Sequence, residues 1–275
     1  MQAFLDGVRH SPGGVGYRAF DLAGPWGLED DPARTTPIVF QHGLGLDGRA
    51  WLPWIRALAG RAPIVSIDMR GHGASVDRWQ APSLEIADYA GDVLDVLDCL
   101  EFDRCHFVGE SFGGTTGLYL GIHHPERFAS LTVVSTGWRG ALVNNIADWP
   151  SVLEKPDGVK RWSDMITAGS FDPASDDPAL IAWAEAQQVK LAPQVVSAIV
   201  KCLRAADLGP DLDRLTMPVL NLTAHRSPFV DMAQHAELAR RLPRYAQVDF
   251  RAAKHRLFLT RADACVDAII RHLDW

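Results

Sequence analysis

The chain has 275 residues, 47% of them hydrophobic, which is enough for one large domain or for a core with a small appendage. Its 27 basic and 34 acidic residues give a formal net charge of −7, and without basic clusters this argues against nucleic acid and membrane surfaces as partners. No apolar run approaches the length of a membrane span, and the first residues lack the pattern of a signal peptide.

Apolar runs that suit buried strands alternate with helical patterns through most of the chain. This alternation predicts an α/β fold with a mostly parallel sheet flanked by helices. Apolar residues recur at helical spacing from Ile86 to Leu100 and from Ala262 to Leu273, which indicates helices that face a core. Eight strands are predicted: Gln2–Val8, Val15–Leu22, Ile38–Gln41, Ile64–Asp68, Cys105–Gly109, Leu131–Ser135, Val219–Thr223 and Gln247–Arg251.

The alternation stops after Ser135, and residues 136–208 show helical patterns but no convincing strand. We interpret this segment as a helical cap inserted into a core made of residues 1–135 and 209–275. Four tryptophans concentrate in the cap. Packing within a small subdomain accounts for most of them, but one or two could line an apolar pocket above the sheet. The candidates for that pocket are Trp138, Trp162 and Trp183.

The most informative motif is Gly109-Glu110-Ser111-Phe112-Gly113, where a strand pattern gives way to a helical one. This Gly-x-Ser-x-Gly spacing is typical of a sharp turn that exposes a serine Oγ at the carboxyl edge of a sheet. The alternative is a glycine-rich turn whose serine has no chemical role. We interpret Ser111 as a nucleophile and expect the Glu110 side chain to point elsewhere.

A serine hydroxyl needs a neighbouring base to take its proton. His255 is the best candidate, because it follows the last predicted strand and precedes the last predicted helix. That position places it at the same edge of the sheet as Ser111. A buried structural histidine is the ordinary alternative, but the charged neighbours Lys254 and Arg256 argue against deep burial.

Negative charge that develops on a carbonyl oxygen needs preorganised hydrogen-bond donors. The backbone amide of Phe112, at the start of a helix, is one candidate donor. The second should come from the loop after the strand Ile38–Gln41, where His42-Gly43 lets the backbone turn towards the serine. The amide of Leu44 is then the expected donor, and His42 is expected to support the loop through hydrogen bonds.

These motifs together resemble the α/β-hydrolase fold family, in particular its enol-lactonase and small carboxylesterase branch. The matching pieces occur in the family's order and cover essentially the whole chain: His42-Gly43, the segment from Asp68 to Ser75, the serine turn, the inserted cap and the late His255. The resemblance implies an α/β-hydrolase fold with Ser111 as nucleophile and His255 as base. It also implies that the Leu44 and Phe112 amides form the oxyanion hole.

The acid of the expected catalytic triad is missing from its usual places. The family carries it after the penultimate strand, where this chain has Ser227, or just past the sixth strand, where it has Ser135-Thr136-Gly137. Asp231 is the nearest carboxylate that a shifted loop could bring to His255. Its alternative role is to stabilise the start of the following helix.

Two other classes of function compete with hydrolysis. The glycines of Gly43–Gly48, with Asp68 about 20 residues later, also fit a dinucleotide-binding loop and hence a nicotinamide-dependent oxidoreductase. The missing acid could instead indicate a lyase, a cofactor-free oxygenase or a ligand-binding protein on the same fold. The sequence has no Tyr-x-x-x-Lys pair, which weakens the oxidoreductase alternative.

We therefore expect a serine hydrolase that cleaves a small, largely apolar ester or lactone through an acyl-enzyme on Ser111. No cofactor and no bound metal are expected, and the expected partner is a small-molecule substrate. The sequence carries no indication of the oligomeric state. The four cysteines lack metal-type spacing and three of them fall in apolar patterns, so we interpret them as buried free thiols in a reducing compartment and expect a cytoplasmic location: Cys99, Cys105, Cys202 and Cys265.

Overall fold

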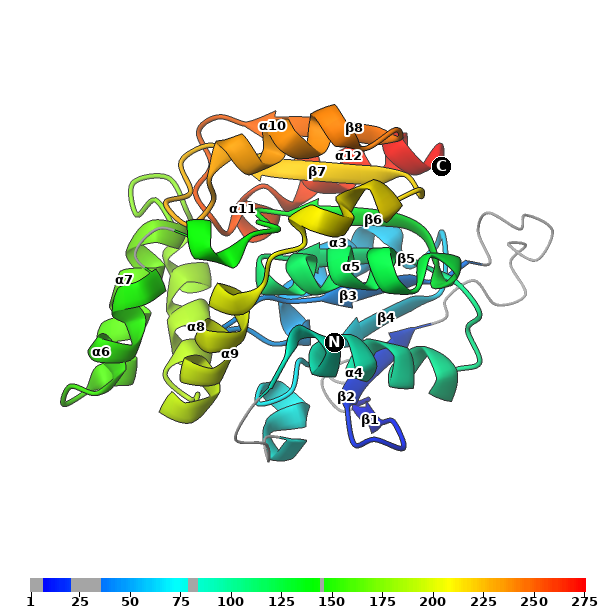
Figure 1. The fold of residues 1–275 in the computed structure, drawn as a ribbon. Coiled ribbons are helices and arrows are strands. Elements are labelled where there is room, and N and C mark those ends of the chain that lie inside the picture. The colour runs from blue at the N-terminus through cyan, green and yellow to red at the C-terminus, as the bar shows by residue number, and fades with distance from the viewer. Residues whose placement is uncertain (1–6, 21–35, 79–83, 144–145) are drawn as a thin grey trace.

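Eight strands form a single sheet in the computed structural model, which describes residues 7–20, 36–78, 84–143 and 146–275 (Figure 1). The strand order is β1-β2-β4-β3-β5-β6-β7-β8. β2 pairs antiparallel with β1 and β4, and all other neighbours are parallel. The predicted sheet is thus confirmed. Its strands are β1 (Arg9–His10), β2 (Gly16–Phe20), β3 (Ile38–Gln41), β4 (Ile64–Ile67), β5 (Cys105–Glu110), β6 (Phe128–Val134), β7 (Val219–Ala224) and β8 (Tyr245–Phe250).

The first strand differs from the sequence prediction. Most of the predicted strand Gln2–Val8 lies outside the described residues, and β1 begins only at Arg9. A tight turn follows β1, in which the Gly14 amide donates to the Ser11 carbonyl at 2.8 Å. Gly14 adopts a φ of 82°, which favours glycine. The last two residues of the predicted strand Val15–Leu22 also lie outside the described residues.

Helices cover both faces of the sheet because alternate strand residues point to opposite sides. On β3, Ile38 and Phe40 belong to the apolar cluster that includes side chains of α3, α11 and α12, whereas Val39 belongs to the one that includes side chains of α4, α5 and α10. Figure 1 shows α4 and α5 together on one side of the strands. These helices are α3 (Leu52–Leu58), α4 (Ile86–Cys99), α5 (Phe112–His123), α10 (Met232–Arg241), α11 (Leu257–Thr260) and α12 (Ala262–Leu273), with short 3-10 turns η2 (Gly48–Trp51), η3 (Gly73–Arg78), η4 (Pro125–Arg127) and η7 (Gly209–Arg214).

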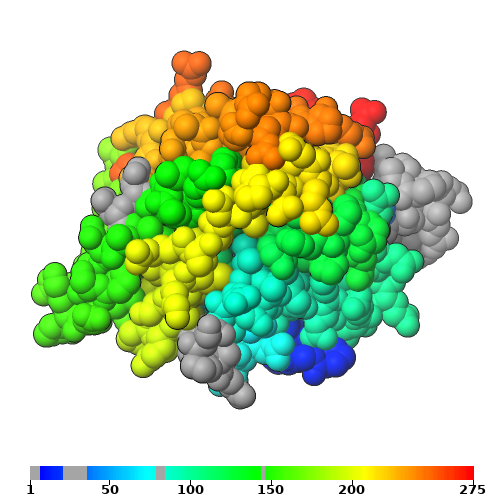
Figure 2. All heavy atoms as spheres, in the orientation of Figure 1, coloured from blue at the N-terminus to red at the C-terminus, as the bar shows by residue number. Residues whose placement is uncertain are grey.

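Four helices lie between β6 and β7, and we call them the cap helices: α6 (Trp149–Leu153), α7 (Gly158–Ser170), α8 (Pro178–Gln188) and α9 (Pro193–Ala205), preceded by η5 (Gly140–Leu142) and η6 (Ile146–Asp148). In Figure 2 this green and yellow segment projects at the left of the molecule. Side chains of α6, α7 and α9 form a third apolar cluster with Leu44, Met69 and Phe112, at the carboxyl edge of the sheet. The cap as a separate domain of residues 136–208 stays a prediction.

Three of the four cysteine thiols are buried, as expected, and all four are free. Cys99 is exposed at the end of α4, so the expectation of burial was wrong there. In the described part of the chain, no helix is both long enough and apolar enough to cross a membrane.

Candidate active site

Ser111 lies in the sharp turn between β5 and α5. Its backbone angles, φ 53° and ψ −120°, are rare for a residue other than glycine and mark a strained position. The flanking glycines allow this turn. A Cβ on Gly109 would collide with the Gly113 backbone, and a Cβ on Gly113 would lie 2.5 Å from the carbonyl oxygen of Gln41.

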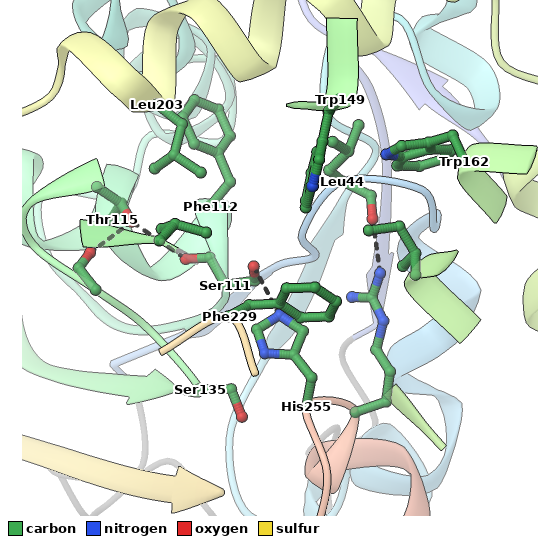
Figure 3. Close-up of a pocket in the computed structure, with 14 residues that line it drawn as sticks. Leu44, Ser111, Phe112, Thr115, Ser135, Trp149, Trp162, Leu203, Phe229 and His255 are labelled. Carbon is green, nitrogen blue, oxygen red and sulfur yellow. Dashed lines mark hydrogen bonds between the residues drawn. The ribbon is translucent and has the colours of Figure 1, made fainter. Parts of the chain in front are cut away.

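His255 lies in the turn between β8 and α11, and its Nε2 is 3.0 Å from the Ser111 Oγ (Figure 3). The expected pair of side chains is therefore in contact. The imidazole is nevertheless buried, so the inference from its charged neighbours was wrong. The Lys254 ammonium reaches the Ala168 carbonyl at 2.7 Å, while the Arg256 guanidinium is itself buried in an ion pair.

The other ring nitrogen of His255 meets a hydroxyl. Its Nδ1 is 2.9 Å from the Oγ of Ser227, in the turn that follows β7. The same oxygen accepts the Phe229 amide at 3.2 Å. A hydroxyl oxygen has two lone pairs, so it can accept both N–H groups. The hydroxyl can also donate to the ring, so this contact fits either tautomer; with the ring proton on Nδ1, Nε2 faces Ser111 as the base.

Asp231 does not meet His255. Its backbone is extended just before α10, and its carboxylate folds back to accept the Ala233 amide at 2.9 Å. This is the helix-capping role that the sequence analysis gave as the alternative. Ser227 takes the position next to the imidazole, and the sequence had placed this residue in the family's usual acid position without giving it a role.

Burial and the adjacent Arg256 guanidinium lower the pKa of His255 well below 6.5. Both act in the same direction, because each disfavours a positive charge on the ring. The Ser227 hydroxyl does not offset them with a negative charge. The imidazole therefore stays neutral, and able to accept a proton, over the neutral pH range.

The amides expected to form the oxyanion hole belong to residues that line the pocket beside Ser111. Phe112 is the first residue of α5, so its amide has no partner within the helix. The peptide unit of the Leu44 amide is oriented by His42, whose Nδ1 donates to the Gly43 carbonyl at 2.8 Å. The His42 Nε2 accepts the Met69 amide at 3.0 Å. Burial lowers the pKa of His42, consistent with this neutral supporting role.

The pocket above Ser111 is small and mostly apolar, with a volume of about 40 Å³. Since an enclosed water needs roughly 10–15 Å³, it would hold a few water molecules or a short apolar group. Figure 3 shows Trp149 and Trp162 on one side and Leu203 on another. The other lining residues are Thr115, Ser135, Gly137, Val143, Ile166, Phe229 and Arg256.

Of the three tryptophans suggested for the pocket, the structure places only Trp162 in its lining. The Trp138 indole packs beside α10 and donates to the Gln234 carbonyl at 2.9 Å. Trp183 lies on α8, with the Arg49 guanidinium 6.0 Å from its ring centre. Trp149, which the sequence analysis did not select, lines the pocket and packs against Trp162.

The candidate dinucleotide-binding residues, the loop Gly43–Gly48 and Asp68, make hydrogen bonds within the protein. The buried Asp68 carboxylate accepts the Gly48 amide at 2.6 Å, the Ala74 amide at 2.8 Å and the Arg18 guanidinium at 3.2 Å. A carboxylate that binds a ribose would need to face a ligand instead. Within the described residues, no group of three or more His, Cys, Asp or Glu side chains could hold a metal ion.

Comparisons with known proteins agree with this fold. The family model for the alpha/beta hydrolase fold matches residues 36–164. The chain is 32% identical over 212 residues to a putative carbamate hydrolase, RutD, of Caulobacter vibrioides, covering 75% of this chain and 78% of that protein. It is 31% identical over 210 residues to 3-oxoadipate enol-lactonase 1 of Acinetobacter baylyi, covering 72% of this chain and 73% of that protein.

A solved structure shares the fold over nearly the whole length. The enol-lactonase from Burkholderia xenovorans LB400 superposes with a TM-score of 0.83, covering 98% of this chain and 100% of that one. The two sequences are 24% identical. This likeness concerns the arrangement of the elements.

Proposed function

The chain belongs to the α/β-hydrolase fold family, and on that basis we propose that it is a serine hydrolase that cleaves a small, largely apolar ester or lactone. The observation that carries the proposal is the 3.0 Å contact between the Ser111 Oγ and the His255 Nε2, beside an apolar pocket. The names of the relatives, a carbamate hydrolase and an enol-lactonase, support hydrolysis at a carbonyl carbon.

In the proposed reaction, the Ser111 Oγ bonds to the substrate carbonyl carbon while its proton passes to the His255 Nε2. The carbonyl electrons move to the oxygen, which the Leu44 and Phe112 amides stabilise. When this intermediate collapses, the bond to the leaving oxygen breaks and His255 returns the proton to it. Water then attacks the acyl carbon while His255 takes its proton; the bond from that carbon to the Ser111 Oγ breaks, His255 returns the proton to Ser111, and the acid is released. For a lactone, the leaving oxygen stays attached to the acyl group.

In this proposal Ser227 orients the base but does not stabilise its charge. In the reactive tautomer the ring proton is on Nδ1 and points to the Ser227 oxygen, 2.9 Å away. A carboxylate would also stabilise the imidazolium that forms during attack, and losing the acid in a serine enzyme costs on the order of 10⁴ in turnover. We infer that the site suits substrates with good leaving groups, such as aryl or enol esters, better than amides or carbamates.

The test is turnover of p-nitrophenyl acetate by Ser111→Ala. We expect its activity to fall to the uncatalysed background, because the nucleophile is removed. Ser170→Ala is a matched control, since Ser170 is a buried serine at the end of α7 that does not line the pocket. Full activity of Ser111→Ala would remove the serine from the mechanism. If the unmodified protein hydrolyses nothing in a panel of esters and lactones, a non-hydrolytic function is favoured.

A further inference from the structure

A buried ion pair connects the residue before the nucleophile to the residue after the base. The Arg256 NH1 nitrogen donates to both carboxylate oxygens of Glu110, at 2.8 and 2.7 Å. Both side chains are at most 2% exposed. The proposed reaction assigns neither of them a step, although burying two charges is costly.

The remaining polar atoms of this pair hold the loop that follows β3. Glu110 Oε2 accepts the Gly43 amide at 2.9 Å, and the Arg256 NH2 donates to the Leu44 carbonyl at 2.6 Å. These two groups belong to the peptide units on either side of the one that contains the Leu44 amide. That middle unit is held by His42. The Leu44 N–H is therefore fixed from three directions.

The loop also packs tightly against the pair. A Cβ at Gly43 would collide with the Glu110 carboxylate and lie 2.8 Å from the Ser111 Cβ. A displacement of the Glu110 side chain would therefore shift both the loop at Gly43 and the nucleophile Ser111. Burial raises the pKa of Glu110, whereas the Arg256 guanidinium and the Gly43 amide oppose that rise. Because three donor contacts converge on its two oxygens, we take the carboxyl to be ionised.

We propose that the Glu110–Arg256 ion pair is a positioning clamp that aims the Leu44 amide at the oxyanion. The proposal rests on the function proposed above, and it identifies the side chains that hold the oxyanion hole of that reaction in place. The clamp joins the end of β5, the loop after β3 and the turn before α11. A donor displaced by about 1 Å can cost on the order of 100-fold in rate, so such a clamp affects turnover.

The pair acts through position and not as the missing acid. The Glu110 Oε1 is 3.6 Å from the His255 Nε2, beyond hydrogen-bond length, and that nitrogen already faces Ser111. The role also requires arginine. The guanidinium uses one terminal nitrogen for the carboxylate and the other for the Leu44 carbonyl. A lysine has a single nitrogen and cannot make both contacts in this geometry.

The test compares Arg256→Lys and Glu110→Gln with the control Arg70→Lys. Arg70 also forms a buried pair, with two contacts of 2.6 Å to Asp92, but it makes no contact with the Leu44 loop. The readouts are kcat/KM for p-nitrophenyl acetate and the inhibition constant of an aryl trifluoromethyl ketone. Such a ketone forms a tetrahedral adduct with a serine and carries an oxyanion, so its affinity reports on the oxyanion hole.

We expect Arg256→Lys and Glu110→Gln to lose about 10- to 100-fold in kcat/KM and a similar factor in ketone affinity. The expected change in KM is within about twofold, because ground-state contacts remain. Arg70→Lys should keep both values. Ketone affinity within about twofold of the unmodified protein in both clamp variants would overturn the proposal, as would equal losses in Arg70→Lys.

If a single clamp variant fails to fold, the double substitution Glu110→Leu/Arg256→Met takes its place in the test, because it removes both buried charges together. It should fold and still lose ketone affinity, and unchanged affinity would contradict the clamp. Ser111→Ala separates this test from that of the proposed function. If Ser111→Ala stays active, the proposed function fails. If it is inactive while the folded clamp variants behave as the unmodified protein does, only the clamp fails.

Discussion

At the scale of single residues, the difference from the usual α/β-hydrolase triad with the largest chemical consequence is at Ser227. Its hydroxyl lies beside His255 where the family carries a carboxylate that would stabilise the protonated base. The Ser227 Oγ lies 2.9 Å from the His255 Nδ1, so a hydrogen bond that orients the ring is kept. The electrostatic part of the acid's role is lost, because a hydroxyl is neutral. Burial and Arg256 then hold the pKa of the ring down.

The pH dependence follows from this lowered pKa. The imidazole accepts the Ser111 proton only when neutral, and a lowered pKa keeps it neutral into the acid range. We expect kcat/KM for a non-ionising ester to stay level from pH 7.5 down past 6.5 and to fall only below that. Ser227→Asp should move this fall to higher pH, because a carboxylate favours the imidazolium. A fall centred at or above pH 6.5 in the unmodified protein would contradict this account.

Removing the Ser227 hydroxyl tests its orienting role. Ser227→Ala leaves the buried Nδ1 without its hydroxyl partner, and an unpaired buried polar group costs about 1–3 kcal/mol. We expect kcat to fall by about 10- to 100-fold. The measurement is kcat for p-nitrophenyl acetate, with Asp231→Asn as the control, since Asp231 caps α10. Equal rates for Ser227→Ala and the unmodified protein would remove Ser227 from the mechanism.

At the scale of elements, the cap helices set the size of the pocket. Trp149 begins α6 and Trp162 lies on α7, and their rings pack edge to face with centres 6.2 Å apart. Together they close one side of a space of about 40 Å³. Few acyl groups beyond the shortest fit this volume without movement of the cap.

This volume predicts a preference for short acyl chains. Along a series of p-nitrophenyl esters, kcat/KM should be highest for acetate and fall as the chain lengthens. Trp149→Ala should shift the optimum to longer chains, because it opens the wall beside Ser111. Trp183→Ala is the matched control, since Trp183 lies on α8 outside the lining. An unchanged optimum in Trp149→Ala would show that Trp149 does not limit the acyl group.

The sequence predicted the strands and the serine turn well, because both depend on local patterns. A continuous apolar run and a fixed glycine spacing can both be recognised in a linear sequence, as β5 and Gly109–Gly113 show. It could not show that Asp231 caps α10 or that Trp138 and Trp183 lie outside the pocket lining, because loop paths and cap packing depend on contacts between distant segments. The burial of Arg256 was missed for the same reason, since its partner Glu110 lies 146 residues away.

At the scale of the whole molecule, the parallel sheet brings the site together. The loops after β3, β5, β7 and β8 all leave the same edge, so residues from Leu44 to His255 meet above it (Figures 1 and 3). The order of these segments could be read from the sequence. The Glu110–Arg256 pair, which joins three of them, could be seen only once they were folded.

The same pair should matter for stability. Arg256→Met leaves the Glu110 carboxylate buried without its counter-charge, and breaking a buried pair on one side costs about 3–5 kcal/mol. We expect urea unfolding to report a loss of that order. Arg226→Met is the control, because Arg226 is half exposed in its pair with Asp172 and such pairs contribute about 0–1 kcal/mol. Equal losses of unfolding free energy in the two variants would mean that the buried pair of Arg256 stabilises the protein no more than an exposed pair does.

The most direct test of an activated serine is covalent labelling by a fluorophosphonate, followed by peptide mass spectrometry. We expect a single phosphonyl adduct on Ser111 that disappears in His255→Ala, because the hydroxyl needs its 3.0 Å contact with the imidazole to react. A folded protein that stays unlabelled at Ser111, or that is labelled equally well without His255, would contradict it.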